Sequence, residues 1–441
     1  MRHPPGPPPR STPPPLRRRL ASLALLAAPL SGLAAASAPP ASCPERLLAE
    51  LGWTVRSAAV AEMAVHPGLP CTRADLADAR AAGDLRVTLP AHWDAGAREA
   101  ALRGLVDTQA TRCAYMFVLG DATRRATAAL AGNPGYRFSA LQLGWIGFGA
   151  GGARAQGWER FRSFGRGYQP SGGNSTALDA FYRGRVRSEC GVGRQVAQLA
   201  TQRELYGDAA FDAEFAPGEL SIGTFLTLHR TDSILLGAHA GEFFADGHAV
   251  RTSRLGRQAF MGVPGFVFHV FDRSYLDDIN NQAENFVVAD VDEAAAAALA
   301  RHGGLGHYDG VNRQLWELAR GLRAGGVRHF QRLLVERDPQ LRAALDPQQR
   351  AGLARMEALL DDPFYRGFEV YVHHKGVRPV GWHVVRLLDR NPRTPYAIEL
   401  GLHNLHTTLY RRWIGQRLRA CGDEAGARTA HAPPASPASP G

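Results

Sequence analysis

The sequence predicts an α+β protein in which helices flank a group of strands. Three features of the 441-residue chain carry this prediction. Residues 44–135 place apolar residues at three- and four-residue spacing, which is typical of amphipathic helices. Between residues 219 and 291, β-branched and aromatic runs are separated by Gly, Asp and Pro, as strands are separated by turns. Helical spacing returns over 292–324.

The ends of the chain differ in composition from its middle. Residues 1–38 read as a signal peptide, because Arg17–Arg19 precede a short apolar run that ends in small residues. An N-terminal helical region then spans 39–135, and a central part with the strands spans 136–325. Residues 326–423 form a C-terminal α/β extension, and 424–441 have the composition of a disordered tail.

Finer elements follow from turn residues and local spacing. We expect helices over 175–181, over 190–206 before the Tyr-Gly-Asp stop, and over 327–362 and 403–420. Residues 367–374 and 381–389 are predicted to be strands.

Charge and hydropathy argue against two classes of partner. The formal net charge is +10, but the first 38 residues carry five arginines and no acid, which leaves +5 for the rest. This excess is too small to indicate a nucleic-acid partner. The arginine–aromatic patch at 160–168 is interpreted as a solvated surface or the rim of a cleft. After residue 38 no segment is long and apolar enough for a membrane span.

Two motifs have partial features of cofactor or metal sites. Gly147, Gly149 and Gly152 satisfy G-x-G-x-x-G, but no acidic residue lies about 20 positions on and no βαβ pattern follows. The histidine pairs 373–374 and 403/406 lack a cysteine or carboxylate partner at matching spacing. The sequence therefore predicts neither a cofactor nor a metal.

One of the five cysteines begins a predicted helix. The cysteines are Cys43, Cys71, Cys113, Cys190 and Cys421, so in an oxidising compartment at least one has no partner within the chain. Cys190 follows Glu189 and opens the helix 190–206. A helix N-terminus favours the thiolate, which makes Cys190 a candidate nucleophile. Half of a disulfide and a small core residue stay open as alternatives, and the pairing of the other four cysteines is not predicted.

A cysteine nucleophile requires a histidine base and a polar side chain that orients it. The residues after Cys190 offer several of each, and spacing alone does not select among them. The candidates are His229, His239, His248, His269, His302 and His307, with Glu242, Asp246, Glu284, Asp290 and Asp292.

Three segments in order resemble the bacterial spore-coat type of protein-glutamine gamma-glutamyltransferase, or transglutaminase. They are "SECGVGRQVAQLATQRELYGDAAFDAEF", "NNQAENFVVADV" and "ARHGGLGHYDGVNRQLWEL", within residues 175–320. The resemblance implies a papain-like or NlpC/P60-like core, with the cysteine helix packed on an antiparallel sheet and a catalytic domain at 136–325. It makes Cys190 the nucleophile, Glu284 the acid and His302 the base, with Glu189 assisting. His307, one turn beyond His302, is the alternative base.

The implied reaction is acyl transfer from a protein glutamine to a lysine side chain, with release of ammonia. Backbone N–H groups near Gly191 are expected to stabilise the oxyanion. The implied partners are exported or envelope proteins that carry Gln and Lys, in the periplasm or outside the cell; the oligomeric state is not predicted. A chain whose one lysine is Lys375 offers few acceptors for self-cross-linking, although genome composition explains the same count. The alternatives are an exported cysteine amidase, deamidase or peptidase, and an exported binding protein without catalysis.

Overall fold

A computed structural model describes residues 43–51, 53–56, 60–63, 85–88, 100, 103–104, 109–138, 157–161, 167–223, 257–269, 283–390, 392–400 and 405–430. All of them belong to one compact unit, Ser42–Gly441. The predicted signal peptide lies outside these residues, as do the G-x-G-x-x-G segment and the strands expected between 224 and 256.

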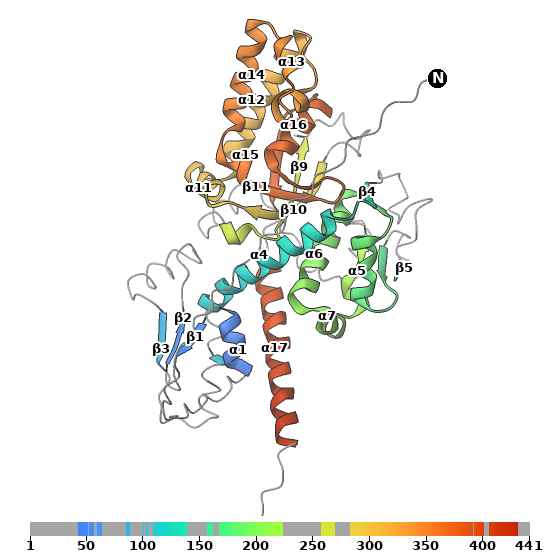
Figure 1. Cartoon of the computed structure of the whole chain (residues 1–441), viewed down its shortest axis with the longest axis vertical. Helices are drawn as coiled ribbons and strands as arrows, with labels where there is room; N and C mark the ends of the chain where they lie inside the picture. Colours follow the sequence, from blue (N-terminus) through green and yellow to red (C-terminus); the bar gives the residue numbers. More distant parts are fainter. Residues whose placement is uncertain are drawn as a thin grey trace, which may run out of the picture. The chain divides into compact units, whose positions relative to one another are not determined.

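A five-stranded antiparallel sheet forms the centre of the fold (Figure 1). Its strands follow the order β12-β11-β10-β9-β13. They are β9 (Pro264–His269), β10 (Ala283–Val291), β11 (Phe368–Val372), β12 (Gly376–Pro379) and β13 (Tyr396–Leu400). The domain boundary predicted between 325 and 326 therefore runs through this sheet, because three of the five strands come from the supposed C-terminal extension. Segments 136–325 and 326–423 build one sheet together, which corrects their description as core and appendage.

Helices cover both faces of the sheet, and β10 shows this most clearly. Val287 and Ala289 belong to a hydrophobic core with α4 (Gln109–Ala131) and α6 (Cys190–Tyr206). Phe286 and Val288 belong to a second core with α12 (Leu305–Ala324) and α16 (Val380–Arg390). Successive side chains of a strand point to opposite faces. A strand that is covered by helices on both faces therefore needs apolar residues at consecutive positions.

A helical segment lies between β10 and β11 in the sequence. It contains α11 (Glu293–His302), α12, a π-helical turn (Gln331–Val335), α13 (Pro339–Ala343), α14 (Pro347–Leu360) and α15 (Pro363–Gly367). Asp292 caps α11, and Gly303 ends it in the left-handed conformation (φ 79°). The helices expected over 292–324 and 327–362 are thus confirmed, with the second divided into the π-helical turn and two α-helices, α13 and α14, that each begin at a proline.

Residues 381–389 form a helix, α16, and the predicted strand there is wrong. The apolar residues "VVRLL" resemble a strand when they are read alone. Burial recurs at Val380, Val384 and Leu387 and also at Gly381, Val385 and Leu388, which is helical spacing. Because α16 packs against the sheet, its wide apolar face mimics the short apolar run of a strand.

The predicted N-terminal helical region also contains strands. α1 (Cys43–Glu50) is followed by a three-stranded antiparallel sheet of β1 (Trp53–Arg56), β2 (Val60–Met63) and β3 (Leu85–Thr88). α4 follows the predicted pattern and ends before the Asn-Pro-Gly turn at 133–135. The expectation of a mostly helical region thus holds for α1 and α4 and is wrong for these three strands.

Short elements surround the cysteine helix α6. They are β4 (Tyr136–Phe138), β5 (Trp158–Phe161), β6 (Gly167–Pro170), α5 (Asn174–Arg183), β7 (Val186–Ser188), α7 (Asp208–Glu214), η1 (Pro217–Leu220), β8 (Ile222–Gly223) and η2 (Arg257–Phe260). β4 pairs in parallel with β7, the strand that leads into α6. The predicted helices at 175–181 and 190–206 are confirmed as α5 and α6.

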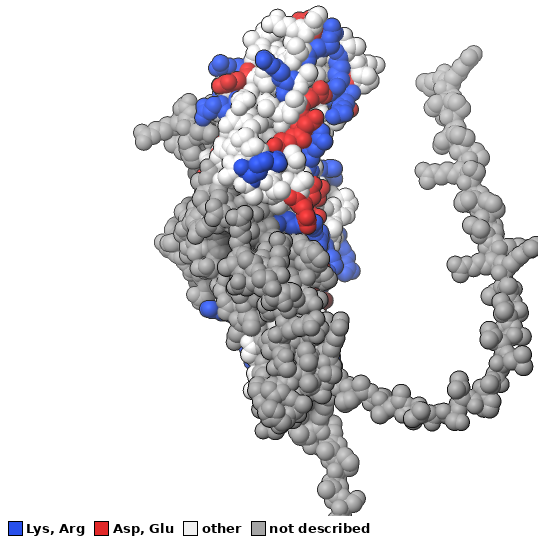
Figure 2. All heavy atoms as spheres, turned by 90° about the vertical axis from the view of Figure 1, so that its left-hand side faces the viewer, with Lys and Arg blue, Asp and Glu red and all other residues white. Residues whose placement is uncertain are grey.

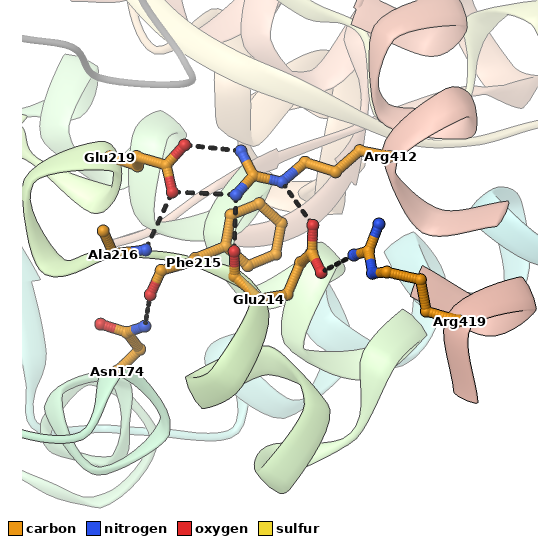
Figure 3. A network of polar contacts seen from close by, with 7 residues as sticks. All are labelled: Asn174, Glu214, Phe215, Ala216, Glu219, Arg412 and Arg419. Carbon is orange, nitrogen blue, oxygen red and sulfur yellow. Dashed lines mark hydrogen bonds and ion pairs between the residues drawn. The ribbon is translucent and has the colours of Figure 1, made fainter. Parts of the chain in front are cut away.

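The C-terminal helix α17 (Leu405–Ala430) is tied to the region after α6 by charged contacts (Figure 3). The Arg412 guanidinium bonds Glu214 at 3.0 Å and Glu219 at 2.6 Å, and it lies 4.3 Å from the Phe215 ring centroid. Arg419 pairs with Glu214 at 2.6 Å. α17 confirms the helix expected over 403–420, and it runs seven residues into the tail predicted to be disordered from 424.

A disulfide joins α1 to α17, and Cys190 remains a free thiol. Cys43 and Cys421 form the bond across 378 residues of sequence. Because the bond closes so long a loop, it lowers the conformational entropy of the unfolded chain. In the chain-entropy account this raises the free energy of unfolding by about 4 kcal/mol or more. Cys71 and the side chain of Cys113 lie outside the described residues.

The described surface on one face carries both signs of charge. Figure 2 shows Lys or Arg side chains next to Asp and Glu side chains there, without a continuous basic field. Among the described helices, none is both long enough and apolar enough to cross a bilayer.

Candidate active site

The first turn of α6 is capped by the residue before the cysteine. The Glu189 carboxylate accepts hydrogen bonds from the N–H groups of Gly191 and Val192, each at 2.7 Å. Glu189 is therefore the N-cap of the cysteine helix, which satisfies two N–H groups that have no partner within the helix. In this geometry the Gly191 N–H faces Glu189, so the expectation that it stabilises an oxyanion is not met.

The Cys190 thiol lies half-buried against the sheet. The Asn285 side-chain N–H₂ on β10 donates to the Cys190 sulfur at 3.2 Å. Burial raises the pKa of the Cys190 thiol to about 12, and the neighbouring Glu189 charge contributes to this rise. Hydrogen bonds from Asn285 act in the opposite direction, because they favour the thiolate. Cys190 therefore rests as a protonated thiol beside an amide donor.

Glu284, the predicted acid, points to the other face of the sheet from Asn285. Its carboxylate is buried, accepts a hydrogen bond from His383 Nδ1 at 3.0 Å and pairs with Arg386. Burial acts to raise the pKa of Glu284, but the bonds and charges of His383 and Arg386 hold it well below its usual range. The residue that meets Cys190 is thus Asn285, one position along the strand, as strand alternation requires.

His302, the predicted base, is not brought together with Cys190 or Glu284 by any contact among the described residues. It ends α11, and its ring stacks on His307 with centroids 3.8 Å apart. Its Nε2 lies 3.9 Å from Asp362, which also accepts a hydrogen bond from Tyr308. The predicted base and its alternative, His307, therefore belong to the helical segment beyond β10.

His373, which the sequence did not select, lies next to the cysteine helix. The β10–β11 register pairs Val287 with Tyr371. β11 ends at Val372, so His373 begins the turn that leads into β12. The His373 Nε2 lies 3.0 Å from the Ser188 carbonyl, two residues before Cys190. Because a carbonyl only accepts, Nε2 carries the proton and Nδ1 has the free lone pair.

The His373 imidazole is buried and neutral. Burial lowers the pKa of His373 to about 4, although hydrogen bonds to the backbone of Ser188 and Arg137 act to raise it. Within the described part of the chain, Nδ1 has no hydrogen-bond partner. A neutral imidazole with an available lone pair is the form that accepts a proton from a thiol.

The Nδ1 edge of His373 lies against Gly193 in the first turn of α6. A Cβ atom at Gly193 would come within 2.4 Å of this nitrogen. Only glycine leaves room for the ring at this distance, so the second glycine of "CGVG" is explained by its contact with His373.

We expect Gly193→Ala to displace the His373 ring. The added methyl group should lower the free energy of unfolding by about 1–3 kcal/mol through overpacking, despite the better helix propensity of alanine. It should also remove most Cys190-dependent activity. The matched control is Gly310→Ala in α12, where a Cβ meets nothing within 4 Å, and urea unfolding should show equal or higher stability. Wild-type activity in Gly193→Ala would contradict the placement of His373.

Comparison with protein-family models, curated proteins and solved structures gives no match to this chain. The arrangement of Cys190, Asn285 and His373 is therefore interpreted from its geometry. A helix N-terminus presents the thiol, strand β10 presents an amide, and the turn between β11 and β12 presents a neutral imidazole. The one sequence signal for His373 is that the predicted strand 367–374 ends in two histidines.

Proposed function

We propose that the protein is a cysteine acyltransferase that uses Cys190 as nucleophile and His373 as base, with protein glutamine as acyl donor. The observation that carries this proposal is the half-buried free thiol at the start of α6, 3.2 Å from the Asn285 amide. The contacts of His373 with Ser188 and Gly193, which lie on either side of Cys190 in the sequence, support its role as base. Glutamine as donor rests on the resemblance of residues 175–320 to transglutaminases.

The resting pair is uncharged. The pKa of about 12 at Cys190 and of about 4 at His373 mean that neither the thiolate nor the imidazolium is formed beforehand. Proton transfer to His373 must therefore accompany attack by the sulfur. The Asn285 N–H₂ stabilises the negative charge that develops on sulfur as the proton leaves.

The reaction has two steps. Cys190 sulfur bonds to the γ-carboxamide carbon of glutamine, the C–N bond breaks, and the proton taken by His373 leaves with ammonia. A primary amine then attacks the thioester carbon, the S–C bond breaks, and the proton from the amine returns to Cys190 through His373. Water in place of the amine would yield glutamate, so exclusion of water from the site determines the outcome.

Export to an oxidising compartment is part of the proposal. The Cys43–Cys421 disulfide supports it, since such bonds persist in exported proteins and are rare in the cytosol. The predicted signal at residues 1–38 points the same way.

The test uses the protein from residue 39 onward with a lysine-methylated, glutamine-rich protein and a fluorescent primary amine. We expect amine incorporation with equimolar ammonia release, and loss of both in Cys190→Ala at unchanged melting temperature. Ammonia without incorporation would assign a hydrolase with the same nucleophile. Activity that persists in Cys190→Ala, or the absence of both products in the wild type, would refute the proposed function.

A further inference from the structure

A cavity of about 800 Å³ is lined in part by His373, the same residue whose Nδ1 edge lies against Gly193. The C-terminal end of α4, strand β4 and the β11–β12 hairpin form its walls. The lining side chains that matter here are Tyr136, Arg137, Phe138, His373, Lys375 and Arg378. His373 therefore belongs both to the cysteine site and to this cavity.

The charged side chains described in the cavity wall are all basic. They are Arg137, Lys375 and Arg378, and no aspartate or glutamate is among the described lining residues. No carboxylate among the described residues forms an ion pair with any of these three. Lys375 is the only lysine of the chain. Unpaired cations in a concave surface attract anionic groups.

The cavity adjoins the segment that leads into Cys190. The Tyr136 hydroxyl lies 2.9 Å from the Ser188 hydroxyl, and the ring centroids of Tyr136 and His373 are 4.6 Å apart. Ser188 thus touches two residues of the cavity wall while it stands two positions before the nucleophile. Two residues of the cavity wall therefore contact the segment from which Cys190 follows.

We propose that this cavity binds acidic side chains of the peptide that carries the reactive glutamine. This inference rests on the proposed function, because it takes Cys190 as the residue that reacts with the glutamine of the bound peptide. Arg137 and Arg378 are exposed at the cavity and bind carboxylates in the fork geometry of the guanidinium. Tyr136 and Phe138 supply apolar surface for the aliphatic part of the peptide. The cavity thereby selects glutamines that are flanked by Asp or Glu.

The test measures peptide binding to the Cys190→Ala protein, so that binding is separated from catalysis. The probes are two fluorescein-labelled, amidated peptides, Gly-Glu-Glu-Gln-Glu-Glu-Gly and Gly-Ser-Ser-Gln-Ser-Ser-Gly, followed by fluorescence anisotropy. We expect the acidic peptide to bind at least tenfold more tightly, with affinity that falls as salt rises. Arg137→Glu and Arg378→Glu should each lower its affinity at least tenfold and leave the neutral peptide unchanged.

The matched control is Arg355→Glu, which makes the same charge change at an exposed position of α14. It should leave both affinities within twofold of the parent. Equal binding of the two peptides, or an equal loss from Arg355→Glu, would overturn the proposal, and so would a labelled oligothymidine that binds more tightly than the acidic peptide.

If the acidic peptide binds as expected while amine incorporation is absent, the cavity assignment stands and the proposed function fails. If amine incorporation occurs while the two peptides bind equally, the proposed function stands and the cavity assignment fails.

Discussion

His373→Gln should lower amine incorporation by a factor of about 10² to 10⁴, the range typical of a lost general base. Glutamine keeps a donor for the Ser188 carbonyl but has no group that accepts the thiol proton and releases it to ammonia. The loss should appear in kcat more than in KM, because His373 acts during bond formation. Initial rates of fluorescent-amine incorporation, with circular dichroism to confirm the fold, provide the measurement.

The comparison variant is His302→Gln. His302 contacts His307 and Asp362 on the helical segment, so its replacement should change the rate by less than about threefold, which is within the usual effect of a surface substitution. If His302→Gln abolishes incorporation and His373→Gln does not, the base assignment inferred from the resemblance is right and the one based on contacts is wrong.

Glu284→Gln should lower the free energy of unfolding at pH 7 by about 3–5 kcal/mol, the cost of removing one partner from a buried charged pair. The amide oxygen of glutamine can accept the bond from His383, but its NH₂ group then faces the Arg386 guanidinium, and two donors oppose each other. Urea denaturation measures the difference. Glu399→Gln on β13 is the control, since that carboxylate has no ion pair among the described residues, and its effect should stay within about 0.5 kcal/mol.

The same substitution should change how stability depends on pH. The pKa of Glu284 is lower in the folded protein than the value of about 4.3 in an unfolded chain. The contribution of the Glu284 ion pair to the free energy of unfolding is therefore complete above a pH of about 4.3. The contribution is lost as the pH falls below about 4.3 toward the folded-state pKa. Wild-type protein should therefore lose more stability than Glu284→Gln as the pH is lowered from about 5 into the acid range. Parallel stability curves would contradict the buried ion pair.

The cysteine helix and strand β10 were predictable because their signals are local. Val192, Val196 and Leu199 mark one face of α6, and Gly207 ends it with φ 74°. The face of β10 that meets Cys190 was not predictable. Helices cover both sides of the sheet, so the alternation of β10 residues does not indicate whether Glu284 or Asn285 faces the thiol.

Sequence separation prevented the prediction of His373 as the histidine of the site. Residues 293–367 form helices between β10 and β11, so His373, in the turn after β11, lies 88 positions after Asn285 although β10 and β11 are neighbouring strands. His302 lies much nearer to β10 in sequence, and the resemblance therefore selected it. Strand order is fixed by non-local pairing, which periodicity does not encode.

Intact-mass spectrometry shows whether Cys190 forms a thioester with glutamine. A glutamine peptide mixed with the protein in the absence of amine, and quenched with acid within seconds, should add the peptide mass less ammonia. The added mass should map to Cys190 and disappear on treatment with hydroxylamine. It should be absent from Cys190→Ala and nearly absent from His373→Gln. A protein that releases ammonia from the peptide while Cys190 stays unmodified, or that carries the adduct on another residue, would refute Cys190 as the nucleophile.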